Sequence, residues 1–161
     1  MAPRLFTSRL GAWVFAVVGL AVQGIAAEPA STLTLRADWF DRGNVAVAEG
    51  GHYADRFACI FNAGELPNQT EYELDLPVAA DYTLVALYAA AESRPLEVYL
   101  DGKKVHHGFA SVTGSWQTST AQWEKQCTFH ATAGRHVLKL LCPGPYMGHV
   151  CALRLESSVA F

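Results

Sequence analysis

The chain has 161 residues, of which 51% are hydrophobic and only 17% are charged, with a formal net charge of -3. This length suffices for one domain with a hydrophobic core. The composition excludes an intrinsically disordered chain, which combines low hydrophobicity with high net charge. It also lacks the basic character of a nucleic-acid-binding protein and the charged, helix-forming composition of a coiled coil.

Residues 1–27 have the pattern of an export signal. A positively charged start precedes an apolar run of about 12 residues, and small residues follow it up to Ala26 and Ala27. A membrane-spanning helix needs roughly 20 apolar residues, so a stable membrane anchor is not expected. We expect cleavage after Ala26 or Ala27, an exported domain over residues 28–161, and a periplasmic or extracellular location.

The rest of the chain alternates apolar and polar residues with a period of two, which is typical of β-strands with one buried face. In chain order, the predicted strands are residues 32–37, 71–76, 82–89, 96–100, 123–132, 135–142 and 150–156. Asp101-Gly102 predicts a tight primed turn, which would close a β-hairpin with the KKVHH segment that follows. No segment has the pattern of a long helix. Short strands at this density predict one all-β domain, a β-sandwich of jelly-roll type.

Four cysteines follow the export signal, and an oxidising compartment permits disulfides between them. Solvent-facing Lys139 and Arg154 would place Cys142 and Cys151 on the buried faces of the last two strands. A short connection between these strands would form a hairpin and bring the two cysteines together. We therefore predict a Cys142–Cys151 disulfide, with two buried thiols as the alternative. Cys59 and Cys127, the two remaining cysteines, would form the second pair.

Common catalytic and cofactor motifs, such as G-x-S-x-G, a phosphate-binding loop or H-E-x-x-H, do not occur. The six histidines are scattered, and we interpret them as solvated or hydrogen-bonded rather than metal-bound. A small glycoside hydrolase would need two opposed carboxylates, for which Asp38 and Asp41 are candidates. Glu71, Glu73 and Asp75 alternate along one strand and indicate the polar face of a sheet. We therefore expect a protein that is not an enzyme.

Aromatic residues in polar loops are the clearest sign of a binding site. Trp116 follows Thr113-Gly114-Ser115, and Tyr146 follows Pro143-Gly144-Pro145. A flat ring in such a loop suits stacking on the C–H face of a sugar, while nearby polar groups bind its hydroxyls. The alternative is that the tryptophans cap the open end of the sandwich. We favour capping for Trp123, which opens a strand, and leave both interpretations open for Trp116.

Eight short segments, taken in chain order, match the motifs of a known family. They are Leu35–Asn44, Asn62–Glu65, Glu71-Tyr72, Tyr82–Ala89, Val98–Gly102, Thr113–Trp116 with Trp123, Ala133–His136 and Ala152–Leu155. The series resembles the carbohydrate-binding modules of families 6 and 35, which are galactose-binding-like domains. The nearest likeness is to modules at the N-terminus of large secreted planctomycete proteins, in which G-E-L-P-N, Y-A-A-A-E-S-R-P and V-T-G-S-W recur.

The resemblance implies a secreted, non-catalytic β-sandwich that binds a glycan or polysaccharide in a cleft between its loops. It implies that Trp116 is the stacking platform for a sugar ring. Tyr146 and His149 occupy the last loop, and together with Asn62 they are the expected contacts at the rim. The alternative is an exported scaffold domain with a vestigial cleft, whose partner is another secreted protein.

The same resemblance raises the question of a structural calcium ion. The family's calcium ligands include acidic residues of the opening strand and an aspartate of the last strand. This sequence keeps Asp38, but it has Arg36 at the first of these positions and Cys151 where the aspartate is expected. A guanidinium repels a cation, and a thiol does not replace a carboxylate as a ligand for calcium. We therefore expect no bound calcium and no other cofactor.

Overall fold

The computed structural model describes residues 28–161, so the predicted export signal lies outside the described residues. The strands are β1 (Ser31–Arg36), β2 (Arg42–Gly43), β3 (Ala46–Ala48), β4 (Cys59–Phe61), β5 (Asn68–Leu76), β6 (Ala80–Ala89), β7 (Leu96–Leu100), β8 (Lys103–Gly108), β9 (Gln122–Ala131), β10 (Gly134–Cys142) and β11 (His149–Ser157). A single 3-10 turn, η1 (Thr118–Thr120), precedes β9. Among these residues, no helix is long and apolar enough to span a membrane.

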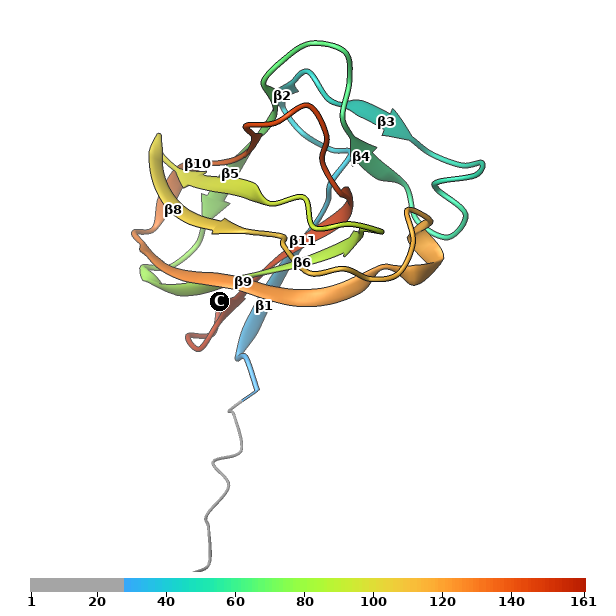
Figure 1. Cartoon of the computed structure of the whole chain (residues 1–161). Coiled ribbons are helices and arrows are strands. Elements are labelled where there is room, and N and C mark those ends of the chain that lie inside the picture. Colours follow the sequence, from blue (N-terminus) through green and yellow to red (C-terminus); the bar gives the residue numbers. More distant parts are fainter. Residues whose placement is uncertain (1–27) are drawn as a thin grey trace, which may run out of the picture.

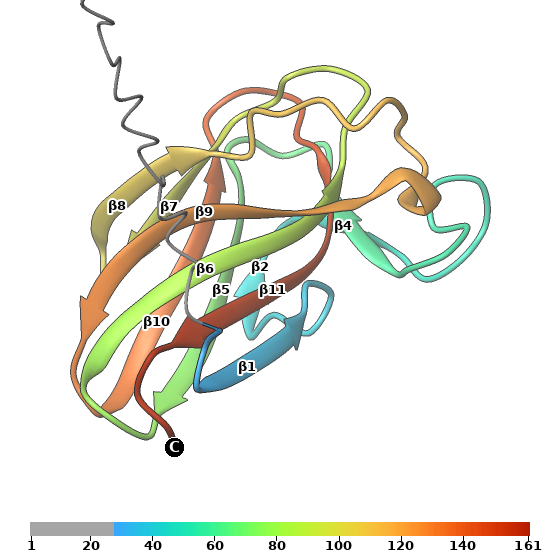
Figure 2. The ribbon, with the colours of Figure 1, turned by 90° about the horizontal axis from the view of Figure 1, so that it is seen from below.

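The strands build two antiparallel sheets that pack face to face (Figures 1 and 2). The first sheet has the order β3-β4-β11-β6-β9, with β1 also paired to β11, and the second has the order β2-β5-β10-β7-β8. Several strands that follow each other in the chain belong to opposite sheets, so the chain crosses repeatedly between the layers. The predicted all-β sandwich is therefore confirmed.

Alternating side chains of the two sheets form the core between them. In β5, Tyr72, Leu74 and Leu76 are buried, whereas Glu73 and Asp75 between them are exposed. This alternation confirms that the acidic residues of this segment form the polar face of a sheet. Burying the apolar face of each strand against the opposite sheet is the main source of stability in such a fold.

The predicted hairpin between β7 and β8 is also confirmed. Asp101 and Gly102 have φ angles of 49° and 77°, the positive values that a primed turn requires. The carboxylate of Asp101 accepts a hydrogen bond from the backbone N–H of Val137 at 2.8 Å, which ties the turn to β10.

The predicted disulfide between Cys142 and Cys151 is wrong, because the two side chains belong to different clusters, and all four cysteines are free thiols in this structure. The strands that carry them, β10 and β11, belong to different sheets, so their connection crosses the sandwich and forms no hairpin. A bulge between Val150 and Ala152 makes Cys151 an extra residue in β11, which shifts the inward–outward alternation by one. Val150 and Leu153 therefore face the main core with Cys142, whereas Cys151 belongs to a separate cluster.

Candidate ligand-binding cleft

Loops at one end of the sandwich enclose a cleft of about 300 Å³. The β3–β4, β6–β7, β8–β9 and β10–β11 connections gather at this end, away from the C-terminus (Figures 1 and 2). The residues that line the cleft are Tyr53, Phe61, Asn62, Arg94, Trp116, Tyr146, Met147 and His149. The structure thus brings together all four residues that the sequence analysis selected, namely Trp116, Tyr146, His149 and Asn62.

His149, the first residue of β11, lies on the buried side of the cleft and is only 6% exposed. Its ring meets that of Tyr53 edge-on, with the ring centroids 4.8 Å apart. Its Nδ1 lies 2.5 Å from the carbonyl oxygen of Trp116. Because a carbonyl only accepts hydrogen bonds, Nδ1 carries the hydrogen of the neutral ring and Nε2 is left as an acceptor. Burial lowers the pKa of His149, which favours this neutral form.

Arg94, from the β6–β7 connection, lies between the rings of Trp116 and Tyr146. Its guanidinium carbon is 4.5 Å from the ring centroid of Trp116 and 4.7 Å from that of Tyr146. A planar guanidinium stacks favourably on aromatic faces, so Arg94 holds the two rings in place. Its Nη2 also lies 3.1 Å from a carboxylate oxygen of Glu92. Arg94 was not predicted as a site residue, although it is part of the E-S-R-P segment that supports the family resemblance.

The opposite wall of the cleft comes from β4 and from the connections on either side of it. The side-chain oxygen of Asn62 accepts a hydrogen bond from the backbone N–H of Met147 at 3.4 Å, which leaves the amide N–H groups of Asn62 for a ligand. Tyr53 and Phe61 were not predicted from the sequence. Tyr53 follows Gly50-Gly51-His52, and an aromatic residue in a glycine-containing loop is the same signal that identified Trp116.

Thr118 joins the two walls of the cleft. This residue is fully buried, and its Oγ1 accepts hydrogen bonds from the backbone N–H groups of Arg56 and Phe57 at 3.1 and 3.0 Å. Its own backbone N–H donates to the carbonyl oxygen of Tyr53 at 2.9 Å. Thr118 therefore fixes the position of Tyr53 relative to Trp116, two residues earlier in the chain.

Asp38, the acidic residue that remains from the implied calcium site, is paired with an arginine. Its two carboxylate oxygens accept hydrogen bonds from Arg36 at 3.0 and 2.6 Å, and its side chain is 4% exposed. In the described part of the chain, no group of three His, Cys, Asp or Glu side chains is placed to hold a metal ion. The residues present therefore do not fit a structural calcium ion, which needs several oxygen ligands.

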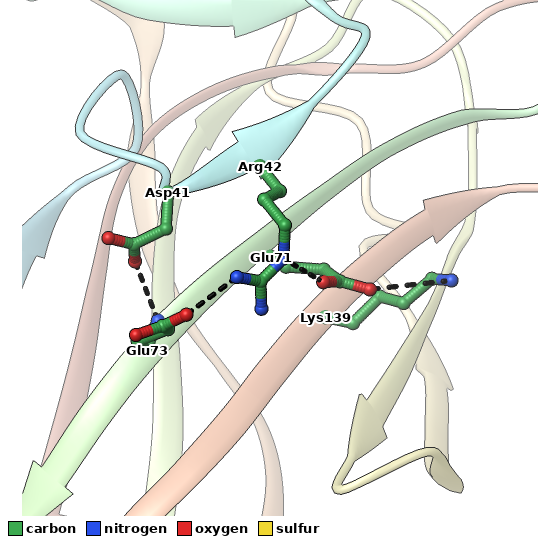
Figure 3. Close-up of polar contacts among 5 residues, drawn as sticks. All are labelled: Asp41, Arg42, Glu71, Glu73 and Lys139. Carbon is green, nitrogen blue, oxygen red and sulfur yellow. Dashed lines mark hydrogen bonds and ion pairs between the residues drawn. The ribbon is translucent and has the colours of Figure 1, made fainter.

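The acidic residues considered for glycoside hydrolysis lie outside the cleft: Asp38 pairs with Arg36, and Asp41, Glu71 and Glu73 lie together beside β2 and β5 of the second sheet (Figure 3). Arg42 pairs with Glu71 at 2.9 Å and with Glu73 at 2.6 Å, and Lys139 lies 3.9 Å from Glu71. Asp41 accepts a hydrogen bond from the backbone N–H of Glu73 at 2.7 Å. None of the residues that line the cleft is acidic, so the cleft offers no pair of carboxylates for acid–base catalysis.

Trp123 lies outside the cleft as well. It is 43% exposed in β9, opposite Leu87 of β6, and the guanidinium carbon of Arg154 lies 4.6 Å from its ring centroid. Trp123 is therefore a residue of the outer face of the first sheet rather than a cap on the end of the sandwich.

No protein-family model and no curated protein matches the chain. Solved structures do match it. A family 35 carbohydrate-binding module from an environmental isolate is 12% identical, with a TM-score of 0.64 over 80% of this chain and 98% of that one. The family 35 module of Abf62 from Cellvibrio japonicus is 15% identical, with a TM-score of 0.66 over 80% of this chain and 95% of that one.

The C-terminal family 6 module of LamC, a marine laminarinase from Zobellia galactanivorans, is 21% identical, with a TM-score of 0.59 over 79% of this chain and all of that one. At these identities the similarities establish the fold. They agree with the galactose-binding-like sandwich that the sequence resemblance implies.

Proposed function

We propose that the domain binds a carbohydrate in the loop-end cleft and does not hydrolyse it. One observation carries the proposal, namely that aromatic rings from separate loops meet around a small set of polar groups. The ring of Tyr146, which is 60% exposed, and the half-buried ring of Trp116 both line the cleft, and such ring surface suits the C–H face of a sugar. The absence of carboxylates from the cleft argues against hydrolysis. Similarity of the fold to solved carbohydrate-binding modules supports the same conclusion.

Polar groups of the cleft provide both donors and acceptors for sugar hydroxyls. The neutral ring of His149 offers Nε2 as an acceptor, since Nδ1 already donates to Trp116. Asn62 offers its amide N–H groups, and Arg94 offers the guanidinium N–H groups that do not contact Glu92. A hydroxyl group both donates and accepts, so this combination orients a sugar that rests on the rings.

We further propose that residues 1–27 direct export and that residues 28–161 form the carbohydrate-binding domain, which acts in the periplasm or outside the cell. The test is the intact mass of the protein recovered from the periplasm or the medium. A chain that begins at Ala27 or Glu28 is expected. A recovered chain that still begins at Met1 would contradict the proposal.

A glycan-array screen of the purified protein tests carbohydrate binding, and analysis of the bound glycans for shorter products tests the absence of hydrolysis. We expect retention of one class of glycan and no release of shorter products. A folded protein that binds no glycan would contradict the binding proposal. Shorter products that appear with time would contradict the non-catalytic assignment.

A second candidate function, docking of another secreted protein, is favoured by apolar residues exposed outside the cleft. Phe57 and Trp123, 36% and 43% exposed, line a hollow on the outer face of the first sheet together with Arg36. Trp39, which is 69% exposed, stacks with Arg36 beside this hollow. Exposed aromatic residues that gather in this way mark interaction surfaces. Absence of glycan binding in the screen would favour this second function.

A further inference from the structure

Cys59 and Cys151 lie across from each other on neighbouring strands. β4 runs antiparallel to β11 with Ile60 opposite Val150. Cys59 and Cys151 are the next residues of the two strands on the same side of this pair, at the point where the carbonyl oxygen of Cys151 accepts a hydrogen bond from the backbone N–H of Ala37 at 3.0 Å. Residues directly opposite in antiparallel strands have Cα atoms about 4.5–5.5 Å apart. Cysteines in neighbouring antiparallel strands are therefore within reach of each other, because a disulfide spans Cα atoms about 4.4–6.8 Å apart.

Both cysteines also share one face of the sheet. Ile60 and Val150 point into the main core, whereas Cys59 and Cys151 pack with Leu87 in a separate cluster. Cys59 is fully buried and Cys151 is 4% exposed. Both are free thiols in this structure, and they lie in the same small apolar cluster with Ala54 and Leu87.

We propose that Cys59 and Cys151 form a cross-strand disulfide when the protein folds in an oxidising compartment. The oxidant is a disulfide of that compartment, on a protein or a small molecule. One cysteine thiolate attacks this disulfide and gives a mixed disulfide, and the second cysteine then displaces the oxidant. Both cysteines lose their protons, and the oxidant takes up two electrons and leaves as two thiols. The proposal assumes the proposed export but does not depend on glycan binding.

The burial of the two thiols in the folded protein indicates that the disulfide forms before folding is complete. The attacking species is the thiolate, and burial raises the pKa of Cys59 to about 11 and the pKa of Cys151 to about 12. Folded thiols of this kind react slowly at neutral pH. The bond therefore forms during folding, before the β3–β4 connection covers the pair, and burial then protects it from reductants.

The disulfide would strengthen the short pairing between β4 and β11. β4 has three residues and meets β11 in a single registered pair, Ile60 with Val150. β4 ends at Phe61, which lines the cleft, and β11 begins at His149, which also lines it. A covalent bond between Cys59 and Cys151 fixes β4, and with it the edge strand β3, to β11 and restricts the unfolded chain.

Peptide mapping tests the pairing directly. The full chain is unfolded and reduced, refolded in a mixture of reduced and oxidised glutathione, alkylated, and digested without reduction. Mass spectrometry is expected to find the peptide of Cys59 linked to the peptide of Cys151, with Cys127 and Cys142 alkylated. Four alkylated cysteines, or a different linked pair, would overturn the proposal.

Thermal denaturation separates the effect of the bond from that of packing. Cys59→Ala, Cys151→Ala and the double variant are each expected to lower the Tm of the oxidised protein by a similar amount, about 5–10 °C, because each removes the same bond. For the wild type, the Tm after refolding without oxidant should be lower than the Tm after refolding with oxidant. For the Cys59 and Cys151 variants the two Tm values should be equal.

Cys142→Ala, in the main core, is the control, and its Tm should still depend on whether oxidant was present during refolding. A wild-type Tm that is independent of oxidant would overturn the proposal.

Discussion

The ring nitrogen Nδ1 of His149 donates a hydrogen bond to the carbonyl oxygen of Trp116 across 2.5 Å. This bond joins the first residue of β11 to the β8–β9 connection, two segments that are distant in the sequence. It fixes the backbone of the tryptophan beside the cleft and sets the tautomer of the histidine. The geometry of the proposed sugar platform therefore depends on a buried, neutral imidazole.

Acidification is expected to destabilise the protein through His149. Burial lowers the pKa of this ring in the folded state, so the unfolded chain binds the proton more tightly. The stability that the neutral ring contributes is present above the ordinary histidine pKa of about 6.5. It is lost as the pH falls through the lower, folded-state value.

The variant His149→Asn keeps an N–H donor near the position of Nδ1 but does not titrate. Between about pH 7 and about pH 5, the range in which histidine titrates, its Tm is expected to fall less than the Tm of the wild type. Thermal denaturation at each pH measures this difference. Equal pH dependence in the two proteins would show that His149 does not carry the effect.

Arg94→Ala is expected to weaken both the fold and the cleft. The change removes the guanidinium that stacks on Trp116 and Tyr146, and the loss in the free energy of unfolding is about 1–2 kcal/mol. Binding of a glycan, followed by titration calorimetry, should weaken because both rings lose their support. Arg154→Ala is the matched control, since it removes a similar stack on Trp123 outside the cleft. An Arg94→Ala protein with wild-type affinity would contradict this role.

Thr118→Val tests the connection between the two walls of the cleft. The change leaves the backbone N–H groups of Arg56 and Phe57 without their acceptor. A buried donor without a partner costs about 1–3 kcal/mol, so a loss of about 2 kcal/mol or more is expected in chemical denaturation, together with weaker glycan binding. Thr83→Val, which breaks a hydroxyl pair with Thr128 on the sheet surface, should cost much less. Equal losses in the two variants would contradict the assignment.

Calcium is expected to leave the stability unchanged. Arg36 occupies both oxygens of the buried Asp38 carboxylate, so an added cation would have to displace this guanidinium. A ligand that binds only the folded state raises the Tm as its concentration rises. The Tm is therefore expected to be the same in a chelator and in an excess of calcium. A saturable rise with calcium would contradict this expectation.

Long alternating segments made most of the fold predictable from the sequence. β5, β10 and β11 each have nine residues, and the hairpin turn at Asp101-Gly102 is set by its own residues. β2, β3 and β4 have only two or three residues, too few to show a period, and they form because longer strands offer them partners. The bulge at Cys151 is likewise a property of the pairing between strands, which is why the predicted disulfide failed.

The candidate site was predictable only in part. Trp116 and Tyr146 were predictable because each is an aromatic residue in a loop of glycine, serine or proline residues, a pattern that indicates a binding site. Arg94 shows no such local signal, because its role comes from contact with rings on two other loops. The role of Thr118 could not be predicted for the same reason, because its hydrogen-bond partners, Arg56 and Phe57, lie about sixty residues earlier in the chain.

Titration calorimetry of tryptophan variants, with a glycan retained in the array screen, tests the central claim most directly. Trp116→Ala is expected to weaken binding by about tenfold or more, which corresponds to about 1.4 kcal/mol. Tyr146→Ala should also weaken it, and this residue is 60% exposed, so its loss does not disturb the core. Trp123→Ala, outside the cleft, should bind as the wild type does. Wild-type affinity in both cleft variants, or loss of binding in Trp123→Ala alone, would contradict the account.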